Sequence, residues 1–414
     1  MKIFFSAGEP SGDLHGANLI REFRRQRPDF VAIGYGGPKM AEAGAQLHFD
    51  LTALAVMWFL RVLLNIHKFL GLLWRADRAF VEDKPDAVVL IDYPGFNWWI
   101  ARRAKARGIP VYYYAPPQIW AWGSWRVKKV QRFVDHVLCA LPFEEPWYRQ
   151  RGCKATFIGH PYFDEVREHP LDEAFVAAER SKPGPLVAIL PGSRTQEVHK
   201  NFRFFLKTAA RVRRQVPGVR FAVAAFKPHQ AEMARQAIAA VGLPIEVYVG
   251  RTPELISAAT CCMAVSGSVS LELLYYGRAT TILYWIGKFP YWVQQQFRHV
   301  KYITLVNLLA GRELYPADIT PYRDDQPDAA SVPFPEYLTG DDRSPEIAAH
   351  LVRWLTDPAA LAAKEAQLAE LRARVAHGGA TKAAVDLILA ELDRPNPAVP
   401  RPHFAGAERR TDAA

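Results

Sequence analysis

Short apolar runs alternate with longer amphipathic segments along most of this chain, and this alternation limits the fold more than any other feature. Each run is followed by Gly, Pro or Ser and then by apolar residues at helical spacing, a pattern typical of β-α repetition in parallel sheets. The first series of expected strands covers residues 2–7, 30–35, 87–92, 111–114, 136–140 and 156–158. The second series covers residues 186–190, 220–225, 245–249, 261–265 and 280–285. The sequence therefore predicts an α/β fold of doubly wound parallel sheets.

The two series are separated by a segment that reads as a domain boundary. Residues 167–185 are charged and Ala-rich and end in Ser-Lys-Pro-Gly-Pro, which neither a helix nor a strand tolerates internally. We therefore expect two Rossmann-like domains, residues 1–166 and residues 185–345, facing a cleft. In open α/β sheets ligands bind beyond the carboxyl ends of strands, so the loops that follow strands are the candidates for chemistry.

The remaining parts of the chain carry weaker patterns. Residues 346–393 show helical spacing throughout, and we expect these C-terminal helices to pack across the two domains. Residues 394–414 are Pro-rich with little to bury, which predicts a disordered tail. Residues 316–345 are rich in Pro and Asp and read as a long surface insertion.

Composition limits the class of function. The 52 Lys and Arg residues against 42 Asp and Glu residues give a net charge of +10, which indicates an anionic partner: a phosphorylated substrate, an acidic membrane or a nucleic acid. The four cysteines form no C-x-x-C pair, so neither a zinc site nor a disulfide framework is expected, and a reducing cytoplasm fits best. No D-x-D triplet occurs and the histidines are scattered, so we expect no metal and no cofactor. No export signal is expected at the N-terminus.

Residues 54–74 suggest contact with a membrane surface, because 16 of these 21 residues are apolar. Polar residues interrupt the run at spacings that place them on one helical face: Arg61, Asn65, Lys68 and Arg75. Large apolar residues lie elsewhere on the helix: Trp58, Phe59, Leu63, Leu70 and Trp74. A cationic amphipathic helix of this kind binds anionic lipid at the headgroup boundary. An ordinary amphipathic helix docked on the sheet is the equal alternative.

Two loops of the first domain follow predicted strands. The Gly-rich turn at residues 8–16 opens a helix and lets the backbone approach a ligand, and it reads equally well as a structural turn. Its candidate residues for substrate binding are Gly8, Ser11, Gly12 and Asp13. The turn lacks the G-x-G-x-x-G pattern, so a dinucleotide is not expected. Asp92 ends an apolar strand, where a general base needs to be held, although a helix cap or an ion pair explains that position too. Asp13 and His15 are the competing bases.

Three loops of the second domain have polar residues at helix starts. Gly192, Ser193 and Arg194, with Glu197 one turn later, form a small-residue turn with an arginine that suits a diphosphate. The second loop repeats this theme with Ser266, Gly267, Ser268 and Glu272. Glu272 is placed either to accept hydrogen bonds from ribose or to form a capping box with Ser268 or Ser270. The third loop, between Asn307 and Glu313, receives no role from composition alone.

Taken in order, these segments resemble the lipid-A-disaccharide synthase family of glycosyltransferases, which has the two-domain GT-B fold. The resemblance covers roughly residues 1–315 and the C-terminal helices. It rests on nine motifs in the order of the family: GEPSGD (8–13), LAVM (54–57), IDYPGFN (91–97), PPQIWAW (116–122), LPFE (141–144), FIGHP (157–161), LPGSRTQEV (190–198), SGSVSLE (266–272) and NLLAGREL (307–314).

The resemblance implies an inverting transfer of 2,3-diacylglucosamine from UDP to the 6-hydroxyl of 2,3-diacylglucosamine 1-phosphate, which forms a β-1,6 disaccharide. It implies that Asp92 is the base, that Arg194 and the 266–268 helix start stabilise the diphosphate, and that Asn307 and Glu313 lie near the nucleotide sugar. Acylated substrates and an anionic acceptor also imply peripheral association with the anionic inner-membrane surface. The oligomeric state, a homodimer among the alternatives, stays open.

Three positions depart from the family pattern, and they put the sugar contacts in question. Val306 stands where the family has proline, residues 268–270 are Ser-Val-Ser instead of Thr-Ala-Ala, and the 316–345 connection is longer. The alternative function is another GT-B enzyme acting on UDP-GlcNAc, either a peptidoglycan-type transferase or an epimerase. A nucleic-acid-binding protein is disfavoured, because the positive charge is dispersed and no recognition motif occurs. A catalytically dead scaffold is distinguished only by assay.

Overall fold

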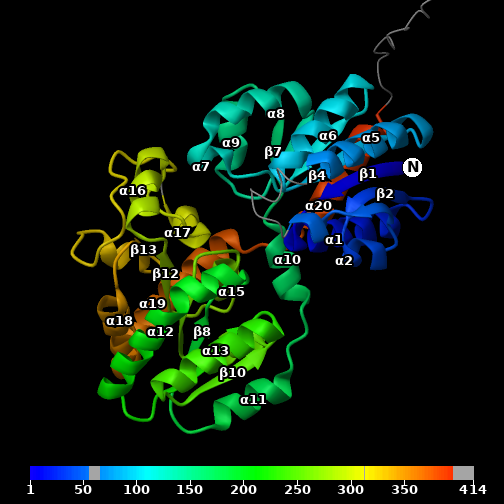
Figure 1. The fold of residues 1–414 in the computed structure, drawn as a ribbon. Coiled ribbons are helices and arrows are strands. Elements are labelled where there is room, and N and C mark those ends of the chain that lie inside the picture. The colour runs from blue at the N-terminus through cyan, green and yellow to red at the C-terminus, as the bar shows by residue number, and fades with distance from the viewer. Residues whose placement is uncertain (56–65, 312, 395–414) are drawn as a thin grey trace, which may run out of the picture.

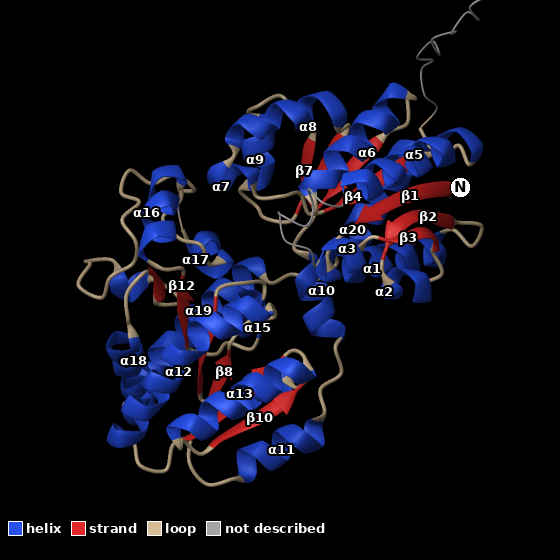
Figure 2. Cartoon of the chain, in the orientation of Figure 1, coloured by secondary structure: helices blue, strands red, loops and turns tan. Residues whose placement is uncertain are grey.

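The computed structural model describes residues 1–55, 66–311 and 313–394 (Figure 1). The fold class predicted from the sequence is confirmed: the chain forms two sheets of parallel strands, and helices cover both (Figure 2). The expected tail falls almost entirely outside the described residues. All four cysteines are buried free thiols.

The first sheet has seven parallel strands in the order β3-β2-β1-β4-β5-β6-β7. The strands are β1 (Lys2–Ala7), β2 (Val31–Gly36), β3 (Gln46–Asp50), β4 (Ala87–Ile91), β5 (Val111–Tyr114), β6 (His136–Cys139) and β7 (Ala155–Phe157). The helices are α1 (Pro10–Gln26), α2 (Pro38–Glu42), α3 (Thr52–Ala55), α5 (Ile66–Glu82), α6 (Pro94–Ala106), α7 (Ile119–Trp122), the 3-10 turn η1 (Ser124–Arg126), α8 (Val127–Phe133), α9 (Glu144–Arg149) and α10 (Pro161–Glu168). The central strand β4 is buried on both faces, which is why it reads as an unbroken apolar run.

The second sheet has six parallel strands in the order β10-β9-β8-β11-β12-β13. The strands are β8 (Leu186–Leu190), β9 (Arg220–Ala225), β10 (Ile245–Val249), β11 (Cys261–Val265), β12 (Thr280–Trp285) and β13 (Glu336–Thr339). The helices of this half are α11 (Glu173–Ser181), α12 (Thr195–Gln215), α13 (Pro228–Val241), α14 (Thr252–Ala258), α15 (Val269–Tyr275), α16 (Lys288–Phe297), α17 (Leu305–Ala310) and the 3-10 turn η2 (Ala329–Ser331). Three C-terminal helices follow: α18 (Ser344–Thr356), α19 (Pro358–Val375) and α20 (Ala380–Leu392).

The interpretation of residues 316–345 as a surface insertion is wrong for its second half. Residues 336–339 form β13, a buried strand that pairs with β12. The stretch before β13 is tied to this strand through Asp324, whose carboxylate accepts hydrogen bonds from Tyr322 Oη at 2.9 Å and Tyr337 Oη at 2.8 Å. His350 Nε2 on α18 lies 2.8 Å from the same carboxylate. These partners hold the pKa of Asp324 at about 2 in spite of its partial burial.

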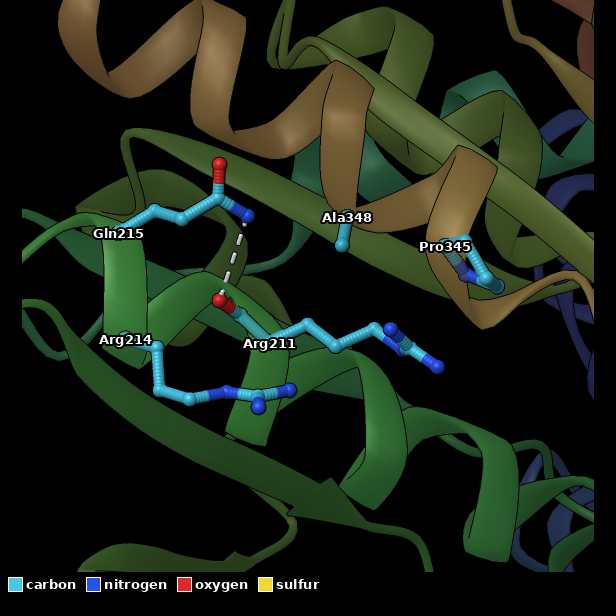
Figure 3. Close-up of a pocket in the computed structure, with 5 residues that line it drawn as sticks. All are labelled: Arg211, Arg214, Gln215, Pro345 and Ala348. Atoms are coloured by element: carbon cyan, nitrogen blue, oxygen red, sulfur yellow. Dashed lines mark hydrogen bonds between the residues drawn. The ribbon is translucent and has the colours of Figure 1, made fainter.

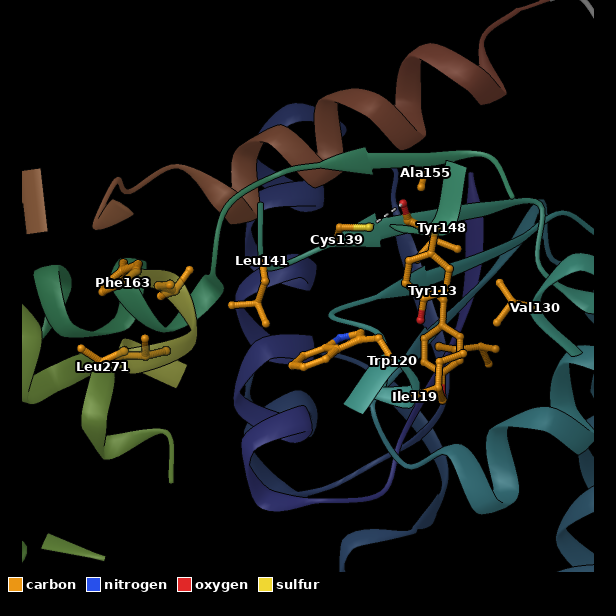
Figure 4. Close-up of a cluster of buried hydrophobic side chains, with 14 of the residues drawn as sticks. Tyr113, Ile119, Trp120, Val130, Cys139, Leu141, Tyr148, Ala155, Phe163 and Leu271 are labelled. Atoms are coloured by element: carbon orange, nitrogen blue, oxygen red, sulfur yellow. Dashed lines mark hydrogen bonds between the residues drawn. The ribbon is translucent and has the colours of Figure 1, made fainter. Parts of the chain in front are cut away.

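A buried polar group connects a loop of the first domain to its core, beside the hydrophobic cluster around Trp120, Tyr113 and Tyr148 (Figure 4). The indole Nε1 of Trp120 donates to Glu144 Oε1 at 2.9 Å, inside a cluster that includes Tyr113 and Tyr148. Glu144 Oε2 accepts from the backbone N–H groups of Ala140, at 3.1 Å, and Leu141, at 3.0 Å. Burial raises the pKa of Glu144 to about 7. One side chain thus ties α7 to the end of β6.

The last helix, α20, packs against the first domain even though it follows the second domain in sequence. It contacts α1 and α10, whereas α18 contacts α12 and α19 contacts α15. Asp164 on α10 holds the start of α20, because its carboxylate accepts hydrogen bonds from Gly379 N and, at 2.9 Å, Thr381 N. Asp164 is buried, so these two bonds are shielded from water.

We predict that Asp164→Ala loosens α20, because it leaves two partly buried N–H groups without an acceptor, at a cost of about 1 kcal/mol. Amide hydrogen exchange across α20 should speed up accordingly. Glu168→Ala, at the exposed end of the same α10, is the matched control and should leave exchange unchanged. Equal exchange in the parent and Asp164→Ala would show that the cap does not hold the helix.

Candidate functional site

The loops after β1 and β8, which belong to different domains, approach each other at the carboxyl edges of the two sheets. Arg194 Nη2, at the start of α12, lies 3.8 Å from Glu9 Oε2, at the start of α1. The carboxylate of Asp92 lies close enough to both residues to influence the pKa of Glu9 and to be influenced by Arg194. These three side chains define the candidate site.

Asp92 is held by an unusual backbone turn. It follows β4 directly and has φ +45°, Tyr93 has φ +47°, and α6 starts at the next residue. Two donors fix this turn through the backbone oxygen of Asp92: Asn97 Nδ2 at 2.7 Å and Tyr113 Oη at 2.9 Å. A left-handed conformation at a residue other than glycine stores strain that the surroundings have to support. The contacts with Asn97 and Tyr113 therefore position the Asp92 carboxylate, which the backbone of Tyr93 also contacts.

Burial and the groups around Asp92 shift its pKa in opposite directions. Burial raises the pKa of Asp92, while a hydrogen bond from the Tyr93 backbone and the nearby charges of His15 and Arg194 lower it by a smaller amount. Burial also raises the pKa of Glu9, followed by the charge of Asp92, whereas Arg194 opposes the shift. A carboxylate with a raised pKa is a stronger proton acceptor than an ordinary aspartate once it is ionised.

The Gly-rich turn after β1 contains both packing and capping residues. A Cβ at Gly8 would lie 2.3 Å from the ring of Tyr93, so glycine is required there by packing, whereas a Cβ at Gly12 would make ordinary contacts. Ser11 is exposed on the first turn of α1. Asp13, expected as a binding residue or a competing base, has its carboxylate engaged by backbone donors. Asp13 is buried and caps α2.

The capping role of Asp13 follows from three backbone donors. Gly37 N and Met40 N donate to its Oδ1 at 2.8 and 3.1 Å, and Lys39 N donates to its Oδ2 at 3.0 Å. The other competing base, His15, is buried as well. Its Nδ1 lies 2.7 Å from Glu165 Oε1 on α10, and its ring packs edge-on to Tyr114. His15 is therefore engaged between α1 and α10.

The turn after β8 presents Arg194 to the cleft. Gly192 has φ +108°, and a Cβ there would lie 2.7 Å from Glu197 Oε2. Arg194 N and Arg194 Nη1 each donate to the Glu197 carboxylate at 3.4 Å, while Ser193 O accepts from Gln230 Nε2 at 2.9 Å. The side chain of Arg194 is 70% exposed, which leaves most of its guanidinium accessible to an anion. Glu197 orients this turn.

The loop after β11 carries hydroxyls at the start of α15. Gly267 and Ser268 are exposed, and the partly buried Ser266 Oγ accepts from Thr304 Oγ1 at 3.4 Å. Glu272 does not form the expected capping box, because no side chain caps α15. Its Oε2 accepts instead from Tyr162 Oη on α10 at 3.1 Å, and burial raises the pKa of Glu272 to about 7. Glu272 therefore joins the two domains.

The resemblance implies that Asn307 lies near the nucleotide sugar, and in this structure its side chain hydrogen-bonds to other groups of the protein. Its amide is buried, with Nδ2 donating to Phe334 O at 2.8 Å and Glu336 Oε2 at 3.1 Å. Its Oδ1 accepts from Phe334 N at 3.0 Å. Glu313 lies exposed beyond α17. Of this pair, only Glu313 has an accessible side chain.

A surface hollow of about 380 Å³ lies away from this site (Figure 3). Its lining residues come from the C-terminal end of α12 and from the start of α18: Arg211, Arg214, Gln215, Pro345 and Ala348. Arg194 stands at the opposite end of α12, about 30 Å away for a helix of 21 residues. We assign the hollow no part in the site.

The amphipathic segment is described only in part. Trp58, Phe59 and Leu63 lie outside the described residues, whereas Leu70 and Trp74 on α5 are exposed. The guanidinium of Arg78 lies 6.0 Å from the centre of the Trp74 ring. Among the described helices, none combines the length and apolarity that crossing a bilayer demands.

Three residues of the site had no assigned role in the sequence analysis: Glu9, Asn97 and Tyr162. Glu9 and Asn97 lie inside quoted motifs, and the signal at Asn97 is an amide one turn into a mostly apolar helix. Tyr162 follows the FIGHP motif directly, but its partner Glu272 is 110 residues away, so only the fold brings them together.

Comparisons with known proteins identify the family of this chain. A family model described as Lipid-A-disaccharide synthetase matches residues 3–346. A lipid-A-disaccharide synthase of Myxococcus xanthus is 34% identical and aligns over 94% of this chain and 97% of its own length. One from Anaeromyxobacter dehalogenans is 35% identical, over 92% of this chain and 94% of its own.

Solved structures show the same fold at low identity. A UDP-GlcNAc 2-epimerase from Neisseria meningitidis bound to UDP-GlcNAc has a TM-score of 0.63 and 12% identity, covering 94% of this chain and all of that one. MurG from Acinetobacter baumannii has a TM-score of 0.54 and 15% identity, over 94% of this chain and 99% of that one. Two parallel-sheet domains of the GT-B type, with the nine motifs in place, identify this chain as a member of the lipid-A-disaccharide synthase family of glycosyltransferases.

Proposed function

We propose that this chain transfers 2,3-diacylglucosamine from UDP to the 6-hydroxyl of 2,3-diacylglucosamine 1-phosphate, with inversion at the anomeric carbon. The observation that carries this proposal is the approach of Arg194 to Glu9 across the two domains, at 3.8 Å, in a site where the charges of Asp92 and Arg194 influence each other. An inverting transfer needs a base for the acceptor hydroxyl and a cation for the departing diphosphate. Asp92 and Arg194 supply one of each.

Asp92 acts as the base in this proposal. Its carboxylate takes the proton of the 6-hydroxyl as that oxygen attacks the anomeric carbon and the bond to UDP breaks. The fixed turn keeps the carboxylate in place during attack, because Asn97 and Tyr113 bind the backbone oxygen of Asp92 and not its side chain. Ser11 and Gly8 border this side, and the acceptor approaches over the start of α1.

Arg194 holds the diphosphate, because a guanidinium binds phosphate oxygens through two parallel hydrogen bonds. Gly192, Ser193 and Glu197 shape the turn that carries it. Ser266, Gly267 and Ser268 offer hydroxyl and backbone donors on the same side, and Glu272 anchors the helix behind them to α10. We keep the exposed Glu313 as a contact of the donor sugar.

The proposed function includes membrane contact through α5, because both substrates carry acyl chains. Leu70 and Trp74 face solvent beside the exposed cations Arg75 and Arg78. Aromatic and cationic side chains on one exposed helix suit an interface with anionic lipid. The enzyme is then peripheral at the inner-membrane surface.

Asp92→Asn should lower turnover by about 10²- to 10⁴-fold, since the amide cannot accept the proton. UDP affinity should stay within about twofold, because the base acts on the acceptor. The assay is UDP release from UDP-2,3-diacylglucosamine, with and without acceptor. In the parent enzyme the raised pKa of Asp92 means that turnover falls as the pH drops through that value. Asp86→Asn, beside the opposite end of β4, is the control, and normal turnover in Asp92→Asn would exclude Asp92 as the base.

Arg194→Ala should weaken UDP binding by about 10- to 100-fold, since a charge-assisted hydrogen bond contributes about 1.5–3 kcal/mol. Arg194→Lys should restore only part of the affinity, because an ammonium group cannot bind bidentately. Arg213→Ala, on an exposed turn of the same helix, is the control. Titration calorimetry with UDP measures all three variants. An unchanged dissociation constant in Arg194→Ala would remove this residue from the site.

The variant Leu70→Ser with Trp74→Ser should bind vesicles that contain phosphatidylglycerol about tenfold more weakly, because it removes exposed apolar surface from α5. Phe226→Ser, an equally exposed apolar residue of the second domain, is the control. Co-sedimentation measures both. If the folded double variant binds as the parent does, α5 does not contact the membrane.

A further inference from the structure

Helix α16 of the second domain exposes more aromatic surface than a helix of its length normally does. It contains ten residues, KFPYWVQQQF, and none is buried. Phe289, Trp292 and Phe297 are 73%, 61% and 60% exposed, and the rings of Phe289 and Trp292 stack with their centres 6.3 Å apart. Contiguous exposed apolar side chains of this kind mark a surface for protein or lipid contact.

A second surface of the same chemistry lies on the first domain at η1 and α8. Trp122 and Trp125 are exposed, and the guanidinium of Arg126 lies 4.3 Å and 5.8 Å from the centres of their rings. Lys128, Lys129 and Arg132 are exposed on the helix that follows. The stretch from residue 119 to residue 134 contains no Asp or Glu, so these cations have no acidic neighbour within their own segment.

Direct contacts connect the two surfaces across the domains. His299 N, two residues after α16, donates to Ala121 O on α7 at 3.4 Å, and Tyr315 Oη donates to Trp120 O at 2.8 Å. Helix α8 in turn contacts α6, and α6 contacts α5. In Figure 1, α8, α6 and α5 lie along the top of the molecule, and α16 lies to the left of α7. The two aromatic surfaces therefore meet across the domains, and helix contacts connect the second of them to α5, which carries Leu70 and Trp74.

The charges beside these two aromatic surfaces indicate which partner binds them. A twofold-symmetric dimer through the same surface would bring Lys128, Lys129 and Arg132 of one chain against those of the other, and like charges across an interface are unfavourable. An anionic bilayer offers the opposite charge at its surface and an apolar layer beneath it, which suits cations beside exposed tryptophans. Charge complementarity thus favours a lipid surface over a second copy of the chain.

We propose that α16 together with η1 and α8 forms a second lipid-binding surface, the interdomain rim, which docks both domains on an anionic bilayer. This inference rests on the proposed function, because the acyl chains of the substrates explain why the enzyme works at a lipid surface. Docking through both domains would place the junction between α7 and α16 against the bilayer and hold the two domains at a fixed mutual angle. Contact through α5 alone would leave the second domain free of the membrane.

Two variants test the rim, and neither changes a residue placed in the site. The aromatic variant combines Trp125→Ser, Phe289→Ser and Trp292→Ser, and the charge variant combines Lys128→Gln, Lys129→Gln and Arg132→Gln. Each should bind vesicles of phosphatidylcholine and phosphatidylglycerol about tenfold more weakly than the parent. Only the charge variant should lose its preference for these vesicles over pure phosphatidylcholine. Phe226→Ser is again the exposed apolar control.

Hydrogen exchange on the parent protein gives a second readout that needs no variant. Residues 288–297 and 124–133 should gain protection when anionic vesicles are added. Unchanged exchange there, with unchanged vesicle binding by both variants, would overturn the rim. A dimer that dissociates in the aromatic variant while vesicle binding persists would overturn it too and assign the surface to self-association.

Turnover separates failure of the rim from failure of the proposed function. With short-chain substrates dispersed in detergent, both rim variants should keep the parent rate, because catalysis then needs no bilayer. Normal turnover with normal vesicle binding in both variants would reject the rim and leave the transferase in place. Absence of acceptor-dependent UDP release from the parent would reject the proposed function itself, whatever the vesicles show.

Discussion

The left-handed turn at Asp92 and Tyr93 is the constraint from which the candidate site is built. Asp92 and Tyr93 follow β4 in the left-handed conformation, and α6 begins at the next residue, so hydrogen bonds have to stabilise this turn. Asn97 supports it from within α6 and also accepts from Ser6 Oγ at 2.6 Å, so the ends of β1 and β4 are fixed together. The strain at one residue is thus distributed over two strands and a helix.

Most of the polar side chains discussed within the family motifs form hydrogen bonds with backbone groups, and few of them are free to bind a ligand. Asp13 caps α2, Glu144 accepts hydrogen bonds from the backbone after β6, and Asn307 binds the backbone of Phe334, just before β13. Each side chain provides a hydrogen-bond partner for backbone N–H or C=O groups that are shielded from water. Without a partner, such groups would destabilise the fold. A polar residue in a motif therefore does not by itself indicate a ligand contact, and the exposed Arg194 and the partly buried Asp92 remain for chemistry.

The periodicity of the sequence was sufficient to predict the central strands but not every edge strand. β3 has alternating exposure and the polar sequence QLHFD, and β13 is only four residues long behind a Pro-rich stretch, so neither forms an apolar run. The loops that follow strands were also predictable, because parallel topology places them at one edge. The pairings His15 with Glu165 and Tyr162 with Glu272 were not, since they depend on where α10 packs between the domains.

The contact between Arg194 and Glu9 is suited to exchange with a substrate. Its atoms are 3.8 Å apart and the arginine is largely exposed, so the pair contributes little to holding the domains together. The proposed diphosphate carries more negative charge than Glu9 and offers bidentate geometry, so it would replace Glu9 as the partner of Arg194. Asp92 would then lose part of a neighbouring positive charge, which raises its proton affinity at the moment the acceptor is to be deprotonated. In this arrangement, binding of the donor raises the proton affinity of Asp92. It can do so because the ion pair between Arg194 and Glu9 is weak enough for the diphosphate to displace Glu9.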